Sequence, residues 1–165
     1  MMWWLLQHSR LGSEKAALAE LESGADWLSV ENWQANSEFE MCVAFAITHG
    51  DRRFGFRMLY PSIFPDAPPM IFTDDASQIS NHQYGADGEL CLEHRPDNWH
   101  PAITGADMVA SCQRLIVEEQ PETGEIVHAR SVHIASLGRE LRSQPCRVLM
   151  SEKEVVALNG LPYRQ

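Results

Sequence analysis

Cys91 is the residue of this sequence best suited to covalent chemistry. It follows Gly88-Glu89-Leu90 in a polar stretch, and Trp99-His100-Pro101 begins eight residues later. A thiolate is a strong nucleophile, and an acyl group held on it as a thioester stays reactive toward amines. The tryptophan and the prolines would fix the path of a loop that presents the sulfur. The pattern therefore predicts acyl transfer through a thioester at Cys91.

The charges around Cys91 oppose one another. Acidic side chains disfavour a thiolate, and three of them stand close in the sequence: Asp87, Glu89 and Glu93. Four cationic or titratable side chains could offset them: His82, His94, His100 and Arg95. We expect a restrained thiol that reacts only with a docked partner. A buried, inert cysteine is the alternative, and the polar neighbours disfavour it.

Size and charge restrict the classes of function. With 165 residues and 44% hydrophobic residues, the chain is long enough for one domain with a full core and too short for two ordinary ones. The formal net charge of -10 opposes binding to nucleic acid and to anionic membranes, and it favours basic partners. We expect a single domain over residues 1–165.

The cysteines and the apolar runs indicate a cellular compartment. Four cysteines are scattered without the dense spacing of a disulfide scaffold, and none forms a Cys-x-x-Cys pair. The apolar run Trp3–Leu6 has no preceding positive charge and is shorter than a signal-peptide core. No segment approaches the roughly 20 apolar residues of a membrane span. A reducing cytoplasm is the expected location, without membrane partners.

The chain reads as an α+β domain. Ser13 is placed to cap a helix over Glu14–Glu22 that Gly24 ends. Residues around Trp4 and His8 could extend this helix backwards. Alternating apolar residues then predict short strands, with a turn at His49-Gly50-Asp51 between the second and third. The four strands are Trp27–Trp33, Met41–Ile47, Phe54–Tyr60 and Met70–Thr73. They predict a four-stranded antiparallel meander.

The segment after the third strand carries prolines at 61, 65, 68 and 69. We expect these prolines to prevent regular pairing between the third and fourth strands. Residues 74–98 lack periodicity, and so long a loop inside a compact domain is usually functional. Thr104 can then cap a helix, with Asp107 in the capping-box position. The buried stripe of this helix would be Met108, Cys112, Leu115 and Ile116.

The signal weakens beyond residue 124. Ile134, Leu137 and Leu141 fit a helical face, and residues 146–150 could form a fifth strand. A second capping box, Ser151-x-x-Glu154, would open a short final helix.

In this order of elements, the motifs around Cys91 resemble those of ubiquitin-conjugating enzymes. The matching pieces are Tyr60-Pro61 with Pro65, then Gly88-x-Leu90-Cys91, then Trp99-His100-Pro101-Ala102-Ile103-Thr104. The spacing from cysteine to tryptophan agrees to the residue, and the likeness covers about residues 13–124. The resemblance implies a ubiquitin-conjugating (UBC-like) fold with a catalytic cysteine and a divergent C-terminal segment over 125–165. Trp99 and Tyr60 would pack the loop onto the sheet.

The sequence departs from the family just before the cysteine. The family carries His-Pro-Asn there, whose asparagine supports the oxyanion or the active-site loop, and this chain has Asn81-His82-Gln83. Gln83 could take the asparagine's role, or Asn81 or His82 could do so. His94 could act as a base or cap the loop. The family also often places an acid beyond the cysteine. Glu118, Glu119 and Glu122 are candidates, although the run Glu118-Glu119-Gln120 is more typical of a solvated helix end.

The divergence resembles the bacterial ubiquitin-conjugating-like proteins of anti-phage defence, of the cyclic-oligonucleotide signalling type (CBASS). That resemblance implies a protein partner supplying a C-terminal acyl group, such as a cGAS-like nucleotidyltransferase or a ubiquitin-like protein. No activating-enzyme domain is evident, so the chain resembles the stand-alone, short version, and the need for a separate activating enzyme stays open. We expect neither a cofactor nor a metal.

Several alternatives remain open. A zinc set could begin with Cys91, His94 and His100. Cys91 with a histidine could serve a cysteine hydrolase, and a UBC fold could act as a non-catalytic binding module. The other cysteines have different expectations. Cys42 and Cys112 fit structural positions, and Cys146 is undetermined.

Overall fold

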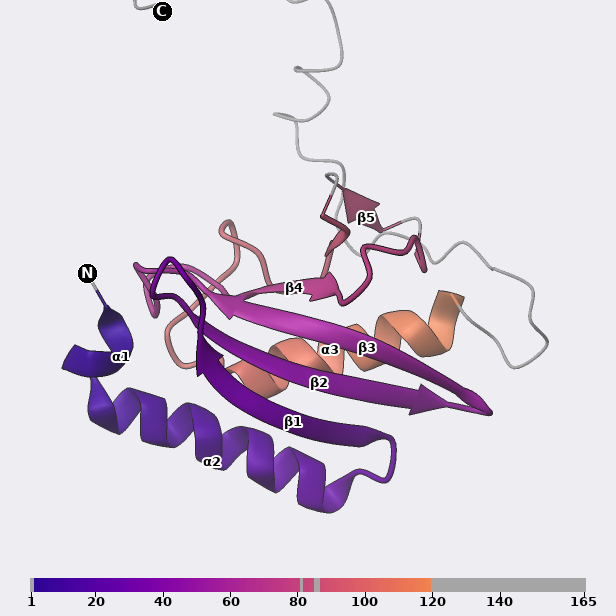
Figure 1. Ribbon diagram of the computed structural model, residues 1–165, viewed down its shortest axis with the longest axis horizontal. Coiled ribbons are helices and arrows are strands. Elements are labelled where there is room, and N and C mark those ends of the chain that lie inside the picture. The colour runs from indigo at the N-terminus through magenta and orange to yellow at the C-terminus, as the bar shows by residue number, and fades with distance from the viewer. Residues whose placement is uncertain (1, 81, 85–86, 120–165) are drawn as a thin grey trace, which may run out of the picture. The chain divides into compact units, whose positions relative to one another are not determined.

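The computed structural model describes residues 2–80, 82–84 and 87–119. Their elements run in the order shown in Figure 1: α1 (Trp3–Leu6), α2 (His8–Gly24), β1 (Leu28–Ala35), β2 (Met41–His49), β3 (Arg52–Tyr60), β4 (Met70–Thr73), β5 (Gln83–Tyr84), β6 (Glu89–Leu90) and α3 (Gly105–Glu119). The α+β expectation, with an N-terminal helix, an antiparallel sheet and a helix after the cysteine, is confirmed. The expectations for residues 120–165, and with them that of a single domain over 1–165, lie outside the described residues.

The sheet extends beyond the predicted meander. Its strand order is β1-β2-β3-β4-β6-β5, and every neighbouring pair is antiparallel. Strands β3 and β4 pair regularly from Phe56↔Thr73 to Leu59↔Met70, so the expected loss of pairing was wrong. The prolines lie between the two strands and leave the ladder intact. Strands β5 and β6 fall within the predicted loop 74–98, which is therefore not wholly irregular.

The core lies between one face of the sheet and the helices α2 and α3 (Figure 1). Phe54, Phe56, Met58 and Tyr60 alternate along β3 and are all buried, as their period of two predicts. Burying each of the larger apolar side chains stabilises the fold by about 1.5–3 kcal/mol. The predicted stripe of α3 is buried too, and it includes Cys112. Burial raises the pKa of the Cys112 thiol, so this cysteine is a neutral core residue.

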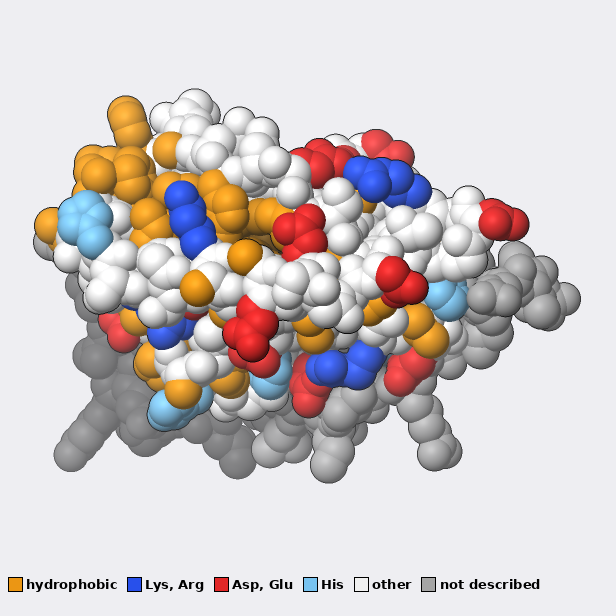
Figure 2. Space-filling view, turned by 90° about the horizontal axis from the view of Figure 1, so that it is seen from below, with side chains coloured by type: hydrophobic (Ala, Val, Ile, Leu, Met, Phe, Trp, Pro, Cys, Tyr) orange, Lys and Arg blue, Asp and Glu red, His pale blue; other side chains and the backbone are white. Residues whose placement is uncertain are grey.

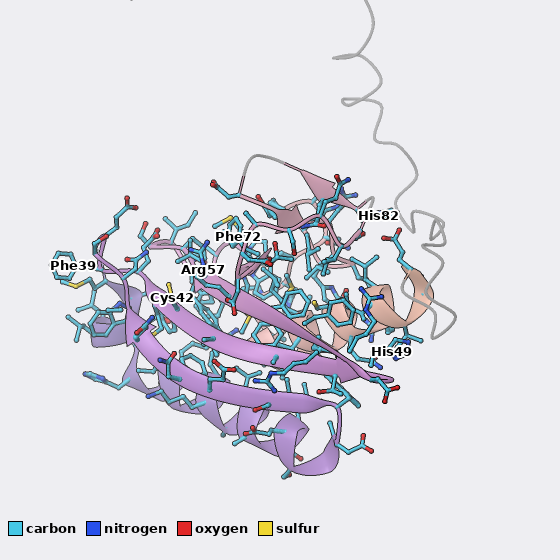
Figure 3. All side chains as sticks on the ribbon, turned by 45° about the vertical axis from the view of Figure 1, so that its right-hand side comes forward. Phe39, Cys42, His49, Arg57, Phe72 and His82 are labelled. Carbon is cyan, nitrogen blue, oxygen red and sulfur yellow. The ribbon has the colours of Figure 1, made fainter. Side chains whose placement is uncertain are left out.

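The other face of the sheet carries Cys42, Arg57 and Phe72, labelled in Figure 3. The register pairs Arg57 with Phe72, and the Arg57 guanidinium lies 5.0 Å from the centre of the Phe72 ring. This distance is within the range of a cation–π contact. Cys42 is buried, and burial raises the pKa of its thiol. The structural position expected for this cysteine is confirmed.

Helix α2 starts earlier than its predicted cap. It begins at His8, so Ser13 lies inside the helix and its hydroxyl donates to the Ser9 carbonyl, 3.0 Å away. The prediction of Ser13 as the N-cap was wrong. An ion pair between Arg10 and Glu14, four residues apart, stabilises the added turn.

Hydrophobic side chains remain exposed near the start of the chain. Leu5, Leu6 and Phe39 are 44%, 64% and 63% exposed. The indole of Trp4 donates to the Phe39 carbonyl at 3.1 Å, which joins α1 to the turn between β1 and β2. Figure 2 shows hydrophobic side chains gathered toward this end of the molecule.

Candidate active site

Cys91 follows β6 directly and is half-buried. Strands β5 and β6 pair Gln83 with Leu90, and the Cys91 N–H donates to the His82 carbonyl at 2.5 Å. This short hairpin therefore fixes the backbone of the cysteine against the segment that carries the family's asparagine position. The sulfur is not sealed in the core, as a reactive cysteine requires.

Gln83 holds that segment together. Its Oε1 accepts hydrogen bonds from the backbone N–H groups of Ile79 and Ser80, at 2.6 and 2.9 Å. Its Nε2 donates to the carbonyls of Ser77 and Gly88, at 2.9 and 3.2 Å. These four bonds use both amide protons, so the side chain organises the loop. Of the alternatives for Gln83, the geometry favours loop support over contact with a reacting oxygen.

His82 and Glu119 meet across the site. The His82 Nε2 lies 3.7 Å from the Glu119 Oε1, and the Glu119 side chain is only 1% exposed. Glu119 is therefore not part of a solvated helix end, as its run of polar neighbours had suggested. The last turn of α3 carries this carboxylate toward the loop, whereas Glu118 is exposed. Asn81 and Glu122 lie outside the described residues.

The loop after the cysteine is shaped by Asn98, which sequence reasoning missed. Its Oδ1 accepts from the Arg95 N–H at 2.6 Å, and its Nδ2 donates to the Glu93 carbonyl at 2.8 Å. Asn98 thus closes this turn, and capping the loop was one of the two roles left open for His94. The run Pro96-Asp97-Asn98 is a turn signal that could have indicated this role of Asn98.

Arg95 is the cation that the structure brings to the sulfur. Its Nη1 lies 3.4 Å from the Cys91 Sγ, within hydrogen-bonding distance for sulfur. Less negative charge surrounds the sulfur than the sequence suggested, because Glu93 forms an ion pair with Arg114 and Asp87 is exposed. The expected offset of negative charge beside Cys91 therefore comes from Arg95.

A mainly apolar hollow of about 180 Å³ lies beside the cysteine loop. His94 and Arg95 border it, together with Leu90 and Leu92, which flank Cys91. The rest of the lining comes mostly from the proline-rich connection and β4: Pro61, Ala67, Pro68, Pro69, Met70, Ile71, Glu89, Pro96 and Met108. The hollow is large enough for one apolar side chain. Its lining includes the residues immediately before and after Cys91 in the sequence.

Glu89 at this hollow gives the fold a testable pH dependence. Burial raises the pKa of its carboxyl. Because the folded value lies above the unfolded one of about 4.3, the stabilisation from binding this proton is present below the unfolded pKa and is lost as the pH rises through the folded pKa. Glu89→Gln should therefore gain melting temperature relative to wild type as the pH rises from about 4 to about 7. Thermal unfolding at both pH values measures this gain, and an equal difference at both would contradict it.

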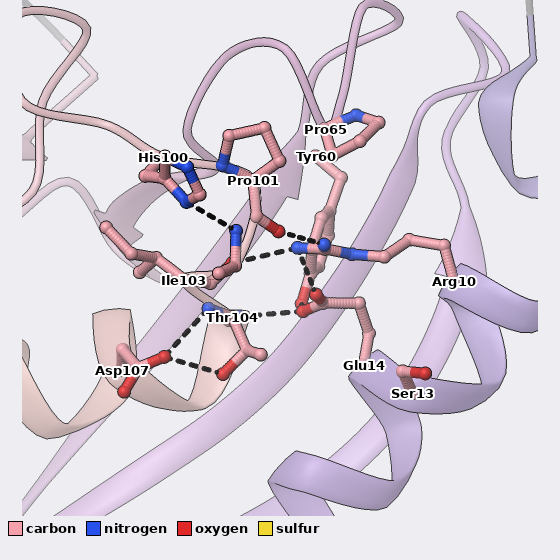
Figure 4. Close-up of polar contacts among 12 residues, drawn as sticks. Arg10, Ser13, Glu14, Tyr60, Pro65, His100, Pro101, Ile103, Thr104 and Asp107 are labelled. Atoms are coloured by element: carbon pink, nitrogen blue, oxygen red, sulfur yellow. Dashed lines mark hydrogen bonds and ion pairs between the residues drawn. The ribbon is translucent and has the colours of Figure 1, made fainter.

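A polar cluster joins α2 to β3 and to the start of α3, and it consists of Arg10, Glu14, Tyr60 and Gly105. Figure 4 shows the first three of these side chains. Glu14 is fully buried, and its Oε2 accepts from the Tyr60 hydroxyl at 2.9 Å and from the Gly105 N–H at 2.7 Å. Its Oε1 lies 2.8 Å from the Arg10 Nη2, an ion pair in which the N–H does not point along the contact. Burial and the Glu14 charge raise the pKa of Tyr60, so its hydroxyl stays a donor.

The cluster also holds the segment that follows the cysteine loop. Arg10 donates to the carbonyls of Pro101 and Ile103, the latter at 2.8 Å. Trp99 donates from its indole to the Pro65 carbonyl at 2.7 Å. Tyr60 and Trp99 therefore fix the loop on the sheet, as expected, but the partners Arg10 and Glu14 were not foreseen.

Two sets of hydrogen bonds fix the start of α3. The Asp107 carboxylate accepts from the Thr104 N–H at 2.7 Å, which is the expected half of a capping box. The Thr104 hydroxyl also donates to this carboxylate, and the Gly105 N–H is satisfied by Glu14 from α2. A Cβ at position 105 would collide with the Tyr60 hydroxyl, so the backbone requires glycine there.

The zinc alternative has no support in this geometry. Among residues 2–80, 82–84 and 87–119, no three His, Cys, Asp or Glu side chains gather closely enough to hold a metal ion. The exposed His100 ring instead accepts from the Ala102 N–H at 3.1 Å. In the same part of the chain, no helix has the length and apolar character needed to cross a membrane. Cys146 lies outside it.

The comparisons with known proteins point to ubiquitin-conjugating-like proteins. No protein-family model matches the chain. A 72-residue stretch is 31% identical to the Nedd8-conjugating enzyme UbcE2M of Drosophila melanogaster, covering 44% of this chain and only 39% of that protein. Similar solved structures include human ubiquitin-conjugating enzyme E2 G1 (18% identity, TM-score 0.48, 63% of this chain and 91% of that one) and the Vps23 UEV in complex with ubiquitin (17%, 0.43, 65% and 80%). Part of this chain is thus similar in sequence to a Nedd8-conjugating enzyme.

Proposed function

We propose that this chain is a ubiquitin-conjugating-like acyltransferase that carries an acyl group as a thioester on Cys91. The observation that supports this most is the half-buried sulfur at the end of a fixed hairpin, with the Arg95 guanidinium 3.4 Å away. The partial sequence similarity to a Nedd8-conjugating enzyme supports the same reaction class.

The reaction has two balanced steps. The Cys91 thiolate attacks the carbonyl carbon of a donor thioester, the new C–S bond forms, and the donor thiolate leaves and takes a proton from water. An acceptor amine then attacks the same carbon, the C–N bond forms, and the bond to Cys91 breaks. The amine proton passes to water, and Cys91 is regenerated. Holding donor and acceptor at one sulfur replaces a difficult amide synthesis by two easier exchanges.

The acyl donor can be narrowed to two kinds of protein. We propose that it is the C-terminus of a protein, either a cGAS-like nucleotidyltransferase in an anti-phage system of the CBASS type or a ubiquitin-like protein. The resemblance of the sequence supports the first, and the similarity to a Nedd8-conjugating enzyme supports the second. A separate activating enzyme would supply the activated donor, in a cytoplasm that keeps Cys91 reduced. Intact mass of the chain after co-expression with each candidate distinguishes them by the mass of the adduct.

The chemistry itself is tested with a small probe, the mercaptoethanesulfonate thioester of diglycine. Wild type should acquire one diglycyl group on Cys91, and a thiol reagent should remove it. Cys91→Ser should give a slower adduct that resists the thiol, and Cys91→Ala should give none. Intact mass and mass mapping of the Cys91 peptide measure these results.

A matched control uses a cysteine on the far face of the sheet. Cys42→Ala should load as wild type does, because Cys42 is buried away from the loop. Equal adduct on Cys91→Ala would overturn the proposal. Release of free diglycine without a persistent adduct would indicate the hydrolase alternative, and full biological activity of Cys91→Ala would indicate the binding module.

A further inference from the structure

Acyl transfer at Cys91 needs a hydrogen-bond donor for the oxygen that becomes negative, and most donors near the sulfur are already used. The Gln83 amide protons are bound to two backbone carbonyls. The Cys91 N–H is bound to the His82 carbonyl, and the Glu93 N–H is bound to the Ser111 hydroxyl at 3.0 Å. The family's amide position therefore does not offer a donor through its glutamine in this chain.

Arg95 differs from these groups. Its Nη1 contacts the Cys91 sulfur, and its Nε is buried without a hydrogen-bond partner among the described residues. Within the described part of the chain, the nearest carboxylate oxygen belongs to the 67% exposed Asp97 and is 4.0 Å from this Nε, beyond hydrogen-bonding distance. A guanidinium carries five N–H groups, and a buried one left unsatisfied costs free energy that native proteins rarely leave unexplained. Asn98 meanwhile fixes the Arg95 backbone.

We propose that Arg95 is the oxyanion donor of this enzyme, in place of the family's asparagine. The inference rests on the proposed function and deepens it. An acyl carbonyl oxygen is two bonds from Sγ, so it forms within reach of a guanidinium already in contact with that sulfur. When the amine attacks, the electron pair of the C=O bond moves to this oxygen, and the Arg95 N–H groups donate to it. When the C–S bond breaks, the pair returns, and the guanidinium again faces the released sulfur.

The positive charge of Arg95 suits both the tetrahedral intermediate and the thiolate that leaves it. Negative charge resides first on the oxygen and then on the sulfur, and the same cation lies beside both. Hydrogen bonds between charged partners are about twice as strong as neutral ones. Loss of one oxyanion donor in other acyl-transfer enzymes slows turnover by about 10²–10³-fold. Arg95→Gln should have an effect of this order.

The experiment compares wild type, Arg95→Gln and Arg95→Lys with two probes. The first is the diglycine thioester, with loading of Cys91 and discharge to free lysine followed by intact mass. The second is iodoacetamide, which alkylates the same sulfur by displacement and forms no oxyanion. Arg95→Gln should slow acyl transfer by about 10²-fold and slow alkylation by a smaller factor, because alkylation loses the cation beside the thiolate but no oxyanion donor. Arg95→Lys should recover part of the loss, since it keeps a charged donor.

The control variant is Arg114→Gln, which removes a nearby exposed cation that pairs with Glu93 and does not contact the sulfur. It should retain the wild-type rate of acyl transfer. Equal acyl transfer by Arg95→Gln and wild type would overturn the proposal. So would a loss of alkylation as large as the loss of acyl transfer, because Arg95 would then only stabilise the thiolate. Failure of the proposed function has its own signature: wild type is alkylated at Cys91 but takes up no acyl group.

Discussion

Glu14→Ala is expected to lower the free energy of unfolding by about 3–5 kcal/mol, because removing one partner of a buried ion pair leaves the other charge uncompensated. The Tyr60 hydroxyl and the Gly105 N–H lose their acceptor, and Arg10 loses its counter-ion. Such a loss is a large fraction of the 5–15 kcal/mol by which ordinary domains are stable. Urea denaturation followed by circular dichroism measures it.

Two further variants make this prediction specific. Glu14→Gln should lie between alanine and wild type, because the amide keeps one acceptor oxygen but loses the charge that faces Arg10. Glu20→Ala removes an exposed glutamate of the same helix and should stay within about 0.5 kcal/mol of wild type. A loss below 1 kcal/mol for Glu14→Ala would show that the polar cluster does not stabilise the fold.

Gln83→Ala is expected to loosen the segment before the cysteine and to cost about 2 kcal/mol or more, since several part-buried backbone groups lose a side-chain partner. The amide protons of Ile79 and Ser80 should exchange with solvent faster, because both donate to Gln83. Hydrogen exchange followed by mass spectrometry or NMR measures this directly, and denaturation gives the energy.

Two further variants distinguish the role of the Gln83 amide oxygen from that of its nitrogen. Gln83→Glu keeps the oxygens that accept from Ile79 and Ser80 but places negative charge against two carbonyl oxygens, so it should protect the N–H groups only in part. Gln78→Ala, an exposed position in the same loop, should leave exchange unchanged. If Gln83→Ala abolished acyl transfer without changing exchange, Gln83 would act on the reacting atoms after all.

Local patterns predicted the elements that bury one face. The alternation of large apolar residues in β2 and β3 gave both strands and their turn, although only β3 is half-buried and β2 is buried on both faces. The stripe of α3 and its Asp107 cap followed from helical spacing in the same way. Strands β5 and β6 escaped detection because two residues are too few to show a period.

The polar contacts around the site could not be read from spacing. Glu14 and Gly105 are 91 residues apart in the sequence and meet only through the packing of α2 against α3. Charge alone suggested a solvated Glu119, yet the last turn of α3 buries it beside His82. The motif around Cys91 located the sulfur, whereas its neighbour Arg95 was one cation among four until the loop geometry was known.

The contact between Arg10 and the carbonyl of Pro101 has a consequence for how the protein reaches its native state. It joins residues 91 positions apart in the sequence, so the entropy of closing the intervening loop must be overcome before the bond forms. The surroundings of the nucleophile are therefore complete only when α2 and the segment before α3 have been brought together. A nascent polypeptide would not acquire its reactivity piecemeal, and shortening α2 by one turn should abolish it from a distance.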